Sequence, residues 1–405
     1  MIGGLLKTTS LVALVAAAGM FSVSAQAADL GGDCCADLEE RVAELEATTA
    51  RKGNRKVSLQ IYGQVTTAVM WFDAQRTDGG VSLRDEQNVY VVDPQTSGTR
   101  FGFKGDAKID ADWSAGFNIE LQYQQADATL VTLDSDEGPD IPEFRQAYWY
   151  LKSKTLGRIA VGQTDTANSS IAEIDVSKAI IADSMSSSAA GAAIISGNLS
   201  GPGQSNYEFN RMNVVRYDSP TFAGFVATAA YGEDDIWDIA LRYAGEFGGF
   251  KLAAGIAYGE STDSSNGAAG TDDPAFEIIN GSVSVMHVST GLFVTASGGQ
   301  RERDSYVGED TFYHVVAGIE QKWMPLGATT IFGMGGEQDE KDSDFGNVDG
   351  DRFEFYGGGI VQQIDAAAME LFLSYRHYDI TDGGDAELDD ESEFDVVVGG
   401  ARIKF

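Results

Sequence analysis

Several kinds of residue are scarce in this sequence, and each shortage excludes a class of protein. The 405 residues include two cysteines, seven prolines and three histidines, and 28 Lys and Arg face 62 Asp and Glu, giving a formal net charge of −34. So acidic a chain does not fit nucleic-acid binding, which needs a basic surface. The cysteines are adjacent, Cys34 and Cys35. Neighbouring cysteines rarely satisfy disulfide geometry, so we expect them to be inert or to bond between chains.

Long apolar runs are also lacking after the amino terminus. Beyond residue 27 no stretch of 18 apolar residues occurs, which excludes helical membrane spans. The run 11–23 follows Lys7 and precedes small residues, the pattern of a secretory signal peptide. We therefore assign residues 1–27 to a signal and expect cleavage between Ala27 and Ala28.

What the chain has instead is glycine, 48 residues, and short runs in which apolar and polar residues alternate. This composition predicts an all-β protein. The first run has an apolar face and a hydroxyl- and amide-rich face, as expected of a strand between lipid and water. The apolar face comprises Val57, Leu59, Ile61, Val65, Val69 and Trp71, and the polar face Ser58, Gln60, Gln64 and Thr66.

Sixteen such runs follow one another, each near the roughly 9 to 11 residues that a tilted membrane strand requires. We predict one barrel domain over 57–405, preceded by a periplasmic segment, 28–56. The runs are 57–71, 99–108, 112–125, 144–152, 157–163, 212–218, 222–231, 236–244, 250–258, 276–287, 291–300, 311–323, 328–336, 352–363, 367–378 and 393–405.

The links between these runs alternate in length. Short links occur at 109–111, 153–156, 219–221, 244–249, 288–290, 324–327 and 364–366. Long links occur at 73–98, 126–143, 164–211, 259–275, 301–310, 337–351 and 379–392, and 232–235 is a short exception on the long side. An even-stranded outer-membrane barrel has short periplasmic turns and long external loops, so this parity predicts such a barrel.

The last run, 393–405, finishes on an aromatic residue. We expect Phe405 to be the assembly signal of the closing strand, with Ile403 facing lipid and with Arg402 and Lys404 facing the interior. This strand should pair with 57–71 to close the sheet.

A sixteen-stranded barrel encloses an aqueous channel. Arg100, Arg158, Arg216 and Arg242 fall on the polar faces of their runs, where water would solvate charges that a dry core would not tolerate. We predict that these four arginines form the basic channel wall. Arg376 and Arg402 share this pattern but lie nearer to strand ends.

The longest link, 164–211, has a stretch rich in Ser, Ala and Gly over 185–203. Such a segment can fold against a barrel wall, although a disordered surface loop is the alternative. Folded inward, the link would set acidic side chains opposite the arginines and create a transverse field. The acidic residues predicted at this constriction are Asp165, Glu173, Asp175 and Asp183.

Several segments together resemble the alpha-proteobacterial general porins: Ala28, Asp29 and Leu30, the segments 33–51 and 52–57, and Phe405. The resemblance covers essentially the whole chain. It implies a sixteen-stranded homotrimer that passes small hydrophilic solutes passively and whose third external loop, here 164–211, forms the constriction. It also implies attachment of the mature terminus at Ala28 and Asp29 to peptidoglycan.

The segment before the barrel carries heptad spacing in Cys35, Leu38, Val42, Leu45 and Thr49. This spacing predicts a short helix that zips three copies together or lies on the barrel mouth.

The acidic links 337–351 and 379–392 predict solvated loops, with weak Ca²⁺ binding or bridging to lipopolysaccharide phosphates as the alternative. We expect no other cofactor or metal. No nucleophile motif accompanies the three histidines, so we expect no enzyme. A substrate-specific channel and a structural anchor between outer membrane and peptidoglycan remain alternatives.

Overall fold

The computed structural model describes residues 56–78, 81–123, 126–135, 142–182, 190–191, 194–195, 205–232, 235–262, 275–304, 308–340, 351–382 and 390–405. The predicted signal peptide with Ala27 and Ala28, the heptad segment and the two cysteines lie outside these residues. Within them, no helix is long and apolar enough to cross a membrane.

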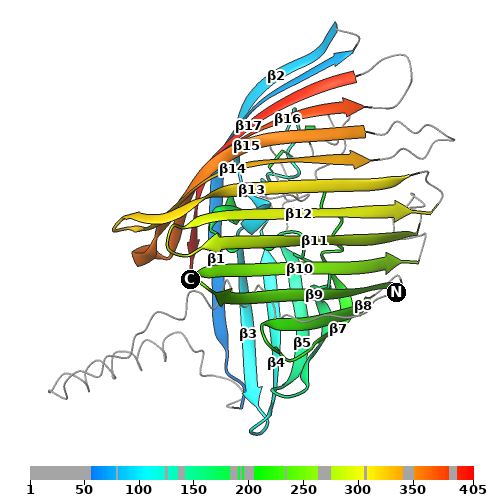
Figure 1. The fold of residues 1–405 in the computed structure, drawn as a ribbon, viewed down its shortest axis with the longest axis vertical. Helices are drawn as coiled ribbons and strands as arrows, with labels where there is room; N and C mark the ends of the chain where they lie inside the picture. Colours follow the sequence, from blue (N-terminus) through cyan, green and yellow to red (C-terminus); the bar gives the residue numbers. More distant parts are fainter. Residues whose placement is uncertain are drawn as a thin grey trace.

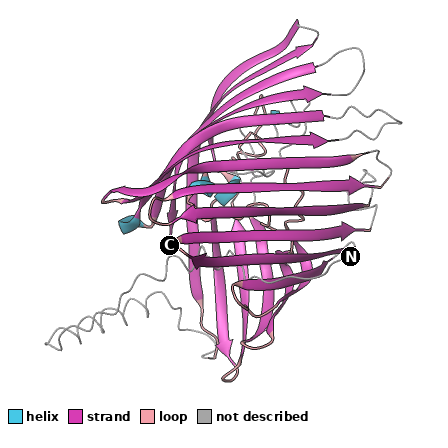
Figure 2. Cartoon of the chain, in the orientation of Figure 1, coloured by secondary structure: helices cyan, strands magenta, loops and turns pink. Residues whose placement is uncertain are grey.

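Nearly all the regular structure is antiparallel sheet (Figures 1 and 2). The strands are β1 (Gln60–Asp78), β2 (Val81–Val92), β3 (Arg100–Lys108), β4 (Trp113–Gln122), β5 (Glu143–Ser153), β6 (Gly157–Asp165), β7 (Arg211–Asp218), β8 (Phe225–Gly232), β9 (Ile236–Phe247), β10 (Phe250–Ser261), β11 (Phe276–His287), β12 (Leu292–Arg303), β13 (Glu309–Met324), β14 (Gly327–Glu340), β15 (Asp351–Ile364), β16 (Met369–Asp382) and β17 (Asp390–Lys404). Three short 3₁₀ turns join them: η1 (Gln95–Ser97), η2 (Ala179–Ile181) and η4 (Asp365–Ala367).

The sheet closes into a barrel. From β3 to β17 each strand pairs with the next, and β17 pairs with β1 from Gln64 opposite Lys404 to Asp78 opposite Asp390. The prediction that the first and last strands pair is therefore confirmed. Strands β2 and β3 both pair with β1, one after the other along its length, so they share one position. The seventeen segments thus make the predicted sixteen-stranded barrel.

The link predicted over 73–98 is different in the structure. Strand β1 continues to Asp78 and β2 runs back alongside it, so most of this link belongs to the sheet. Residues 84–88 are all charged or amide residues, so apolar and polar residues do not alternate there in the sequence. Alternation appears only over 89–92, where Tyr90 and Val92 are buried and Val89 and Val91 are exposed. Pairing with β1 overrides this polar composition.

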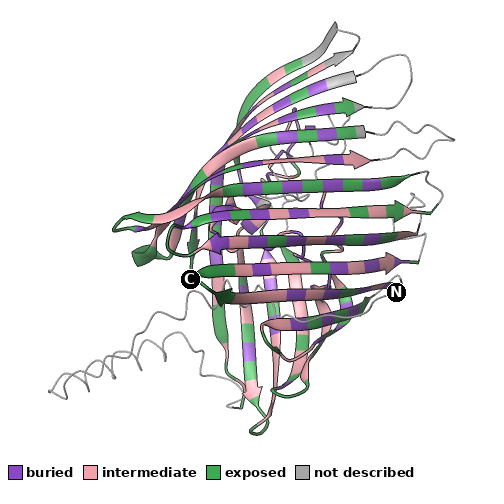
Figure 3. Cartoon of the chain, in the orientation of Figure 1, coloured by how far each residue is buried: buried purple, intermediate pink, exposed green. Residues whose placement is uncertain are grey.

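Side chains alternate between the outside and the interior along the strands, which Figure 3 shows as alternating bands on β12 and β13. On β1, Ile61, Val65 and Val69 are about half exposed while Thr66 and Met70 are buried. On β17, Ile403 points outward while Arg402 and Lys404 line the interior cavity, as predicted, and Phe405, directly after the strand, is exposed. The outward side chains are thus largely apolar, the pattern expected of a strand between lipid and water.

The interior is not uniformly polar. Inward aromatic residues of β1, β2 and β13–β17 form one buried apolar cluster with parts of the β4–β5 and β6–β7 links. Rings such as Phe72, Tyr378 and Phe394 lie against one another, with centroids 5.7 to 6.0 Å apart for the pairs that include Phe394. The largest fully buried link residues in this cluster are Leu133, Ile194 and Ile195. Two inserted links therefore fill part of the lumen and confine water to the remainder.

Candidate functional site

A cavity of about 1880 Å³ occupies the part of the lumen that the apolar cluster leaves open. Its wall comes from β1 and β3–β7, the β6–β7 link, and the short-turn ends of β13–β17. Charged, amide and tyrosine side chains line most of it. A space this large and polar holds water and admits solutes.

The inserted β6–β7 link forms one side of this cavity, so the predicted inward fold is confirmed. Main-chain N–H groups of the link donate to side chains on strands far across the barrel. Asn168 donates to Asp238 on β9 at 2.6 Å, Ile174 to Ser282 at 3.2 Å and Val176 to Ser284, both on β11, at 3.0 Å. These bonds satisfy link backbone that would otherwise be buried without partners, and they fix the link inside the barrel.

The part of the cavity wall that β3 and β6 contribute is basic. Arg100 of β3 and Arg158 of β6 line the cavity as predicted. Arg158 is neutralised by Asp218 of β7, with Nε and Nη2 at 2.9 and 2.7 Å from Oδ2. For Arg100, no ion pair or hydrogen bond of the guanidinium occurs within the part of the chain that the structure describes. Its guanidinium lines the cavity without a neutralising partner among the described residues.

Two further arginines, Arg145 and Arg211, join this wall, and the sequence pattern did not reveal them. In the β4–β5 pairing Glu120 lies opposite Gln146 and the next pair is Leu121 with Phe144, so Arg145 is the extra residue of a β-bulge. A bulge breaks strict alternation, which is why counting in twos misplaces this residue. Arg211 opens β7 at a position that the sequence assigned to the link. Its charge, directly before the predicted run 212–218, was the only available signal.

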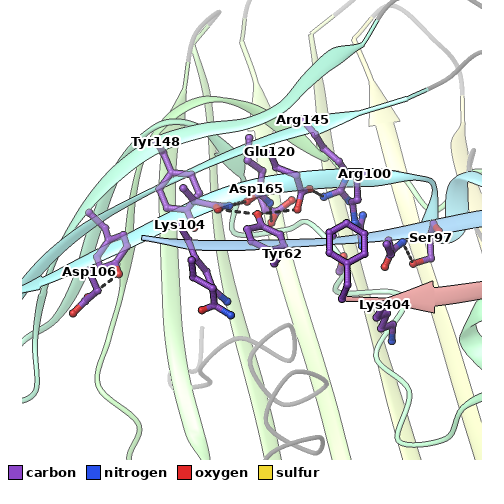
Figure 4. A pocket seen from close by; sticks show the side chains of 18 of the residues that line it. Tyr62, Ser97, Arg100, Lys104, Asp106, Glu120, Arg145, Tyr148, Asp165 and Lys404 are labelled. Carbon is purple, nitrogen blue, oxygen red and sulfur yellow. Dashed lines mark hydrogen bonds and ion pairs between the residues drawn. The ribbon is translucent and has the colours of Figure 1, made fainter. Parts of the chain in front are cut away.

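Carboxylates and a tyrosine hold the basic wall in place. Arg145 Nη1 lies 2.8 Å from Glu120 Oε1, and Tyr62 Oη lies 3.0 Å from Oε2 of the same carboxylate (Figure 4). Arg211 Nη1 lies 3.6 Å from Asp165 Oδ1. On β17, Arg402 pairs with Glu370 of β16.

Arg216 and Arg242 do not line the channel, which corrects the prediction for both. They are buried beneath the inserted link. Arg216 donates from Nη1 to the carbonyl oxygens of Asp165 at 2.8 Å and Thr166 at 2.9 Å, and Arg242 donates to that of Ser169. The sequence predicted correctly that both side chains point inward. Because the link covers them, however, they hold the link in place and do not contact solute.

The four acidic residues predicted at the constriction also lie in different places. Glu173 and Asp175 of the link line the cavity. Asp165 lines it too, but it is the last residue of β6 and belongs to the basic wall, beside Arg211. Asp183 lies outside the described residues. Glu173 and Asp175 of the link and Asp165 of β6 therefore line the same cavity as Arg100 and Arg158.

Glu208, at the far end of the link, is a further acidic residue that the sequence did not single out. Its carboxylate accepts from the N–H groups of Ser170 at 2.5 Å and Ala172 at 2.8 Å. Burial and the neighbouring Glu173 carboxylate raise the pKa of Glu208 to about 8. This residue ties the two ends of the link together.

The family described as Gram-negative porin matches residues 11–390. This chain belongs to the Gram-negative porin family. It is accordingly an outer-membrane channel through which solutes diffuse. The match and the geometry agree, since a closed sixteen-stranded sheet with a water-accessible, charged lumen is what such a channel requires.

Solved outer-membrane proteins share the fold at low identity. A trimer form of OmpT of Vibrio cholerae is 14% identical with a TM-score of 0.52, over 86% of this chain and 99% of that one. OmpF of Salmonella typhi in complex with daunomycin is 16% identical (TM-score 0.51), and the channel DcaP of Acinetobacter baumannii 12% identical (TM-score 0.53); each alignment covers 87% of this chain and 99% of the other. A search of curated proteins found no match.

Proposed function

We propose that this porin passes small hydrophilic solutes and ions by passive diffusion, belongs to the alpha-proteobacterial general porins and has no enzymatic activity. The observation that supports this proposal most is the inserted β6–β7 link. The link fills part of the lumen, and its Glu173 and Asp175 line the same polar cavity as Arg100 and Arg158, which supports a constriction with charges of both signs. Charge on both sides of a narrowing admits hydrated polar solutes and disfavours apolar ones.

We further propose a homotrimer in contact with outer-membrane lipids and lipopolysaccharide, with the mature terminus attached to peptidoglycan. Support for the trimer is indirect: the fold is shared with a protein solved in a trimer form. Support for the lipid contact is the apolar outer face, where Ile61, Val65 and Ile403 are each nearly half exposed. We keep weak Ca²⁺ binding at the acidic outer links as part of the proposal; those links lie largely outside the described residues.

Planar-bilayer recording of the purified mature protein tests the proposal. We expect ohmic currents that appear and close in groups of three equal steps, and liposomes that swell in sugars at rates falling smoothly with solute size. Saturable block by one sugar would instead indicate a substrate-specific channel. Folded protein without any conductance would refute the diffusion function and leave the structural anchor.

A further inference from the structure

The charge of the cavity wall is opposite in sign to that of the chain. Of the described residues that line the cavity, twelve are Lys or Arg and nine are Asp or Glu. The whole sequence has 28 basic and 62 acidic residues. Folding therefore gathers basic residues in the lumen, and a solute in the channel meets this local charge at close range while more distant charges are screened by salt.

Three guanidinium groups on this wall are incompletely neutralised. Arg100 has no ion-pair partner among the described residues. Arg211 is 3.6 Å from Asp165, which is too long for a hydrogen bond. Arg145 lies 2.8 Å from one oxygen of Glu120, whose other oxygen is taken by Tyr62. Since each guanidinium has five N–H donors, most donors of the three remain available.

The same groups lie close enough to repel one another. Arg100 is within electrostatic range of Arg145, Arg211 and Arg402, and Figure 4 shows Arg100, Arg145 and Glu120 gathered on one wall of the pocket. Clustering of like charges is unfavourable unless an anion or water compensates it. The side chains of Arg145 and Arg211 are 20% and 29% exposed, so an anion in the lumen can reach them.

Asp175, one of the link carboxylates that line the cavity, is held by four hydrogen-bond donors. The carboxylate of Asp175 accepts hydrogen bonds from the Ser177 N–H at 2.9 Å and hydroxyl at 2.6 Å, from Thr295 at 2.9 Å and from Ser284 at 3.2 Å. Two of these donors belong to the link and two to β11 and β12, so the Asp175 carboxylate is held between the link and the barrel wall. Glu173 is the other cavity-lining carboxylate of the link.

We propose that Arg100, Arg145 and Arg211 form a binding site for small divalent oxyanions in the lumen, which makes this porin prefer anions. The proposal rests on the diffusion function above and specifies its preferred solutes. Guanidinium groups bind phosphate and carboxylate oxygens through two parallel hydrogen bonds, and two negative charges offset more of this cluster than one does. Phosphate-bearing solutes and dicarboxylates share this chemistry.

The test is a reversal-potential measurement in a potassium chloride gradient, followed by titration with inorganic phosphate at about pH 8, where it is mainly divalent. Wild-type porin is expected to favour chloride over potassium and to lose chloride current saturably as phosphate is added. Succinate in place of phosphate distinguishes the two sources: block by phosphate, by succinate or by both supports the site and identifies its solute.

Variants locate the site. R100Q should shift the reversal potential towards potassium and weaken phosphate block about tenfold or more, since a charge-assisted hydrogen bond contributes on the order of 1.5–3 kcal/mol. R100K should keep the reversal potential while still weakening the block, because an ammonium group lacks the guanidinium fork. R352Q is the matched control: it removes the same charge from an outer position, where Arg352 pairs with Glu337 and Glu354.

Three results would overturn the site: a wild-type preference for potassium, absence of phosphate and succinate block, or equal effects of R100Q and R352Q. Folded protein that conducts nothing would refute the diffusion function separately. In that case calorimetric titration of the same folded protein with phosphate decides the site, since binding that R100Q abolishes supports it and absence of binding refutes it.

Discussion

Gly63 and Phe405 exchange two backbone hydrogen bonds, each 3.0 Å long, where the first and last strands meet. The ring of Phe405 also covers Gly63: a Cβ at position 63 would lie 2.5 Å from Cζ of that ring and 2.8 Å from the carbonyl oxygen of Arg100. The carboxyl-terminal aromatic therefore packs over a glycine at the seam of the barrel, and the seam depends on both residues.

Gly63→Ala is expected to destabilise barrel closure, because the added methyl group meets a backbone oxygen that cannot easily move. The temperature at which the folded band disappears in heat-modifiable gel electrophoresis should fall. Gly333→Ala is the control, since a Cβ at that position in β14 would lie 3.7 Å from its nearest contact, the carbonyl oxygen of Gly357. Equal melting of the two variants would contradict the role of the seam.

Arg216→Gln is expected to loosen the inserted link. It removes hydrogen bonds to the carbonyl oxygens of Asp165, the last residue of β6, and Thr166, the first of the link. It also breaks the ion pair in which Arg216 Nη2 lies 2.9 Å from Asp218 Oδ1. Breaking a buried ion pair costs about 3–5 kcal/mol. Single-channel records should show larger and noisier open currents than wild type or Arg352→Gln. Open currents equal to those of wild type would show that the remaining hydrogen bonds of the link hold it in place without Arg216.

Phe394→Ala is expected to lower stability without closing the channel. Phe394 is fully buried in the interior apolar cluster, with its ring centroid 6.0 Å from that of Phe72 and 5.7 Å from that of Tyr378. Truncating such a ring costs roughly 3–5 kcal/mol. Denaturant unfolding measures the loss. Phe144→Ala, at an exposed outer position, should cost much less, and a similar cost at both sites would argue against a packed interior.

The raised pKa of Glu208 predicts a pH-dependent stability. Because folding raises the pKa of Glu208 from its usual 4.5 to about 8, the folded state holds this proton more tightly than the unfolded chain. The free energy of unfolding should therefore fall as pH rises from about 4.5 to about 8 and be insensitive to this group outside that window. The groups that face it are the N–H groups of Ser170 and Ala172, with Glu173 and Arg242 nearby.

Glu208→Gln should remove that dependence while keeping an acceptor for the link. Thermal melts across the window compare the variant with wild type. Glu354→Gln, at an exposed outer position, is the control because its side chain is 51% exposed. A wild-type stability that rises with pH, or a slope that the Glu208 variant keeps, would refute the assignment.

Asp175→Asn is expected to shift the reversal potential further towards chloride. The substitution removes one negative charge from the link side of the cavity and keeps an oxygen at Oδ1, which the Ser177 N–H and the Thr295 hydroxyl can still bond. Because four donors already spread this charge, the shift should be smaller than the opposite shift of R100Q. An equal or larger shift would mean that Asp175 dominates the narrowing.

The sequence by itself determined the barrel. Alternation of outward Ile61, Val65 and Ile403 with inward Gln64 and Arg402 is a property of neighbouring residues along one strand, because successive side chains of an extended chain point to opposite faces. The alternating link lengths and the pairing of the closing strand with the first follow from the same local pattern.

Only the tertiary structure decided which charges meet water. Arg100 and Arg216 have the same sequence signature, yet one faces the cavity and the other lies under the inserted link. A β-bulge turned Arg145 inward, and apolar residues of two links met rings from distant strands. These outcomes depend on contacts between segments more than a hundred residues apart, as between Ile174 and Ser282, and no period along the chain encodes where a long link will settle.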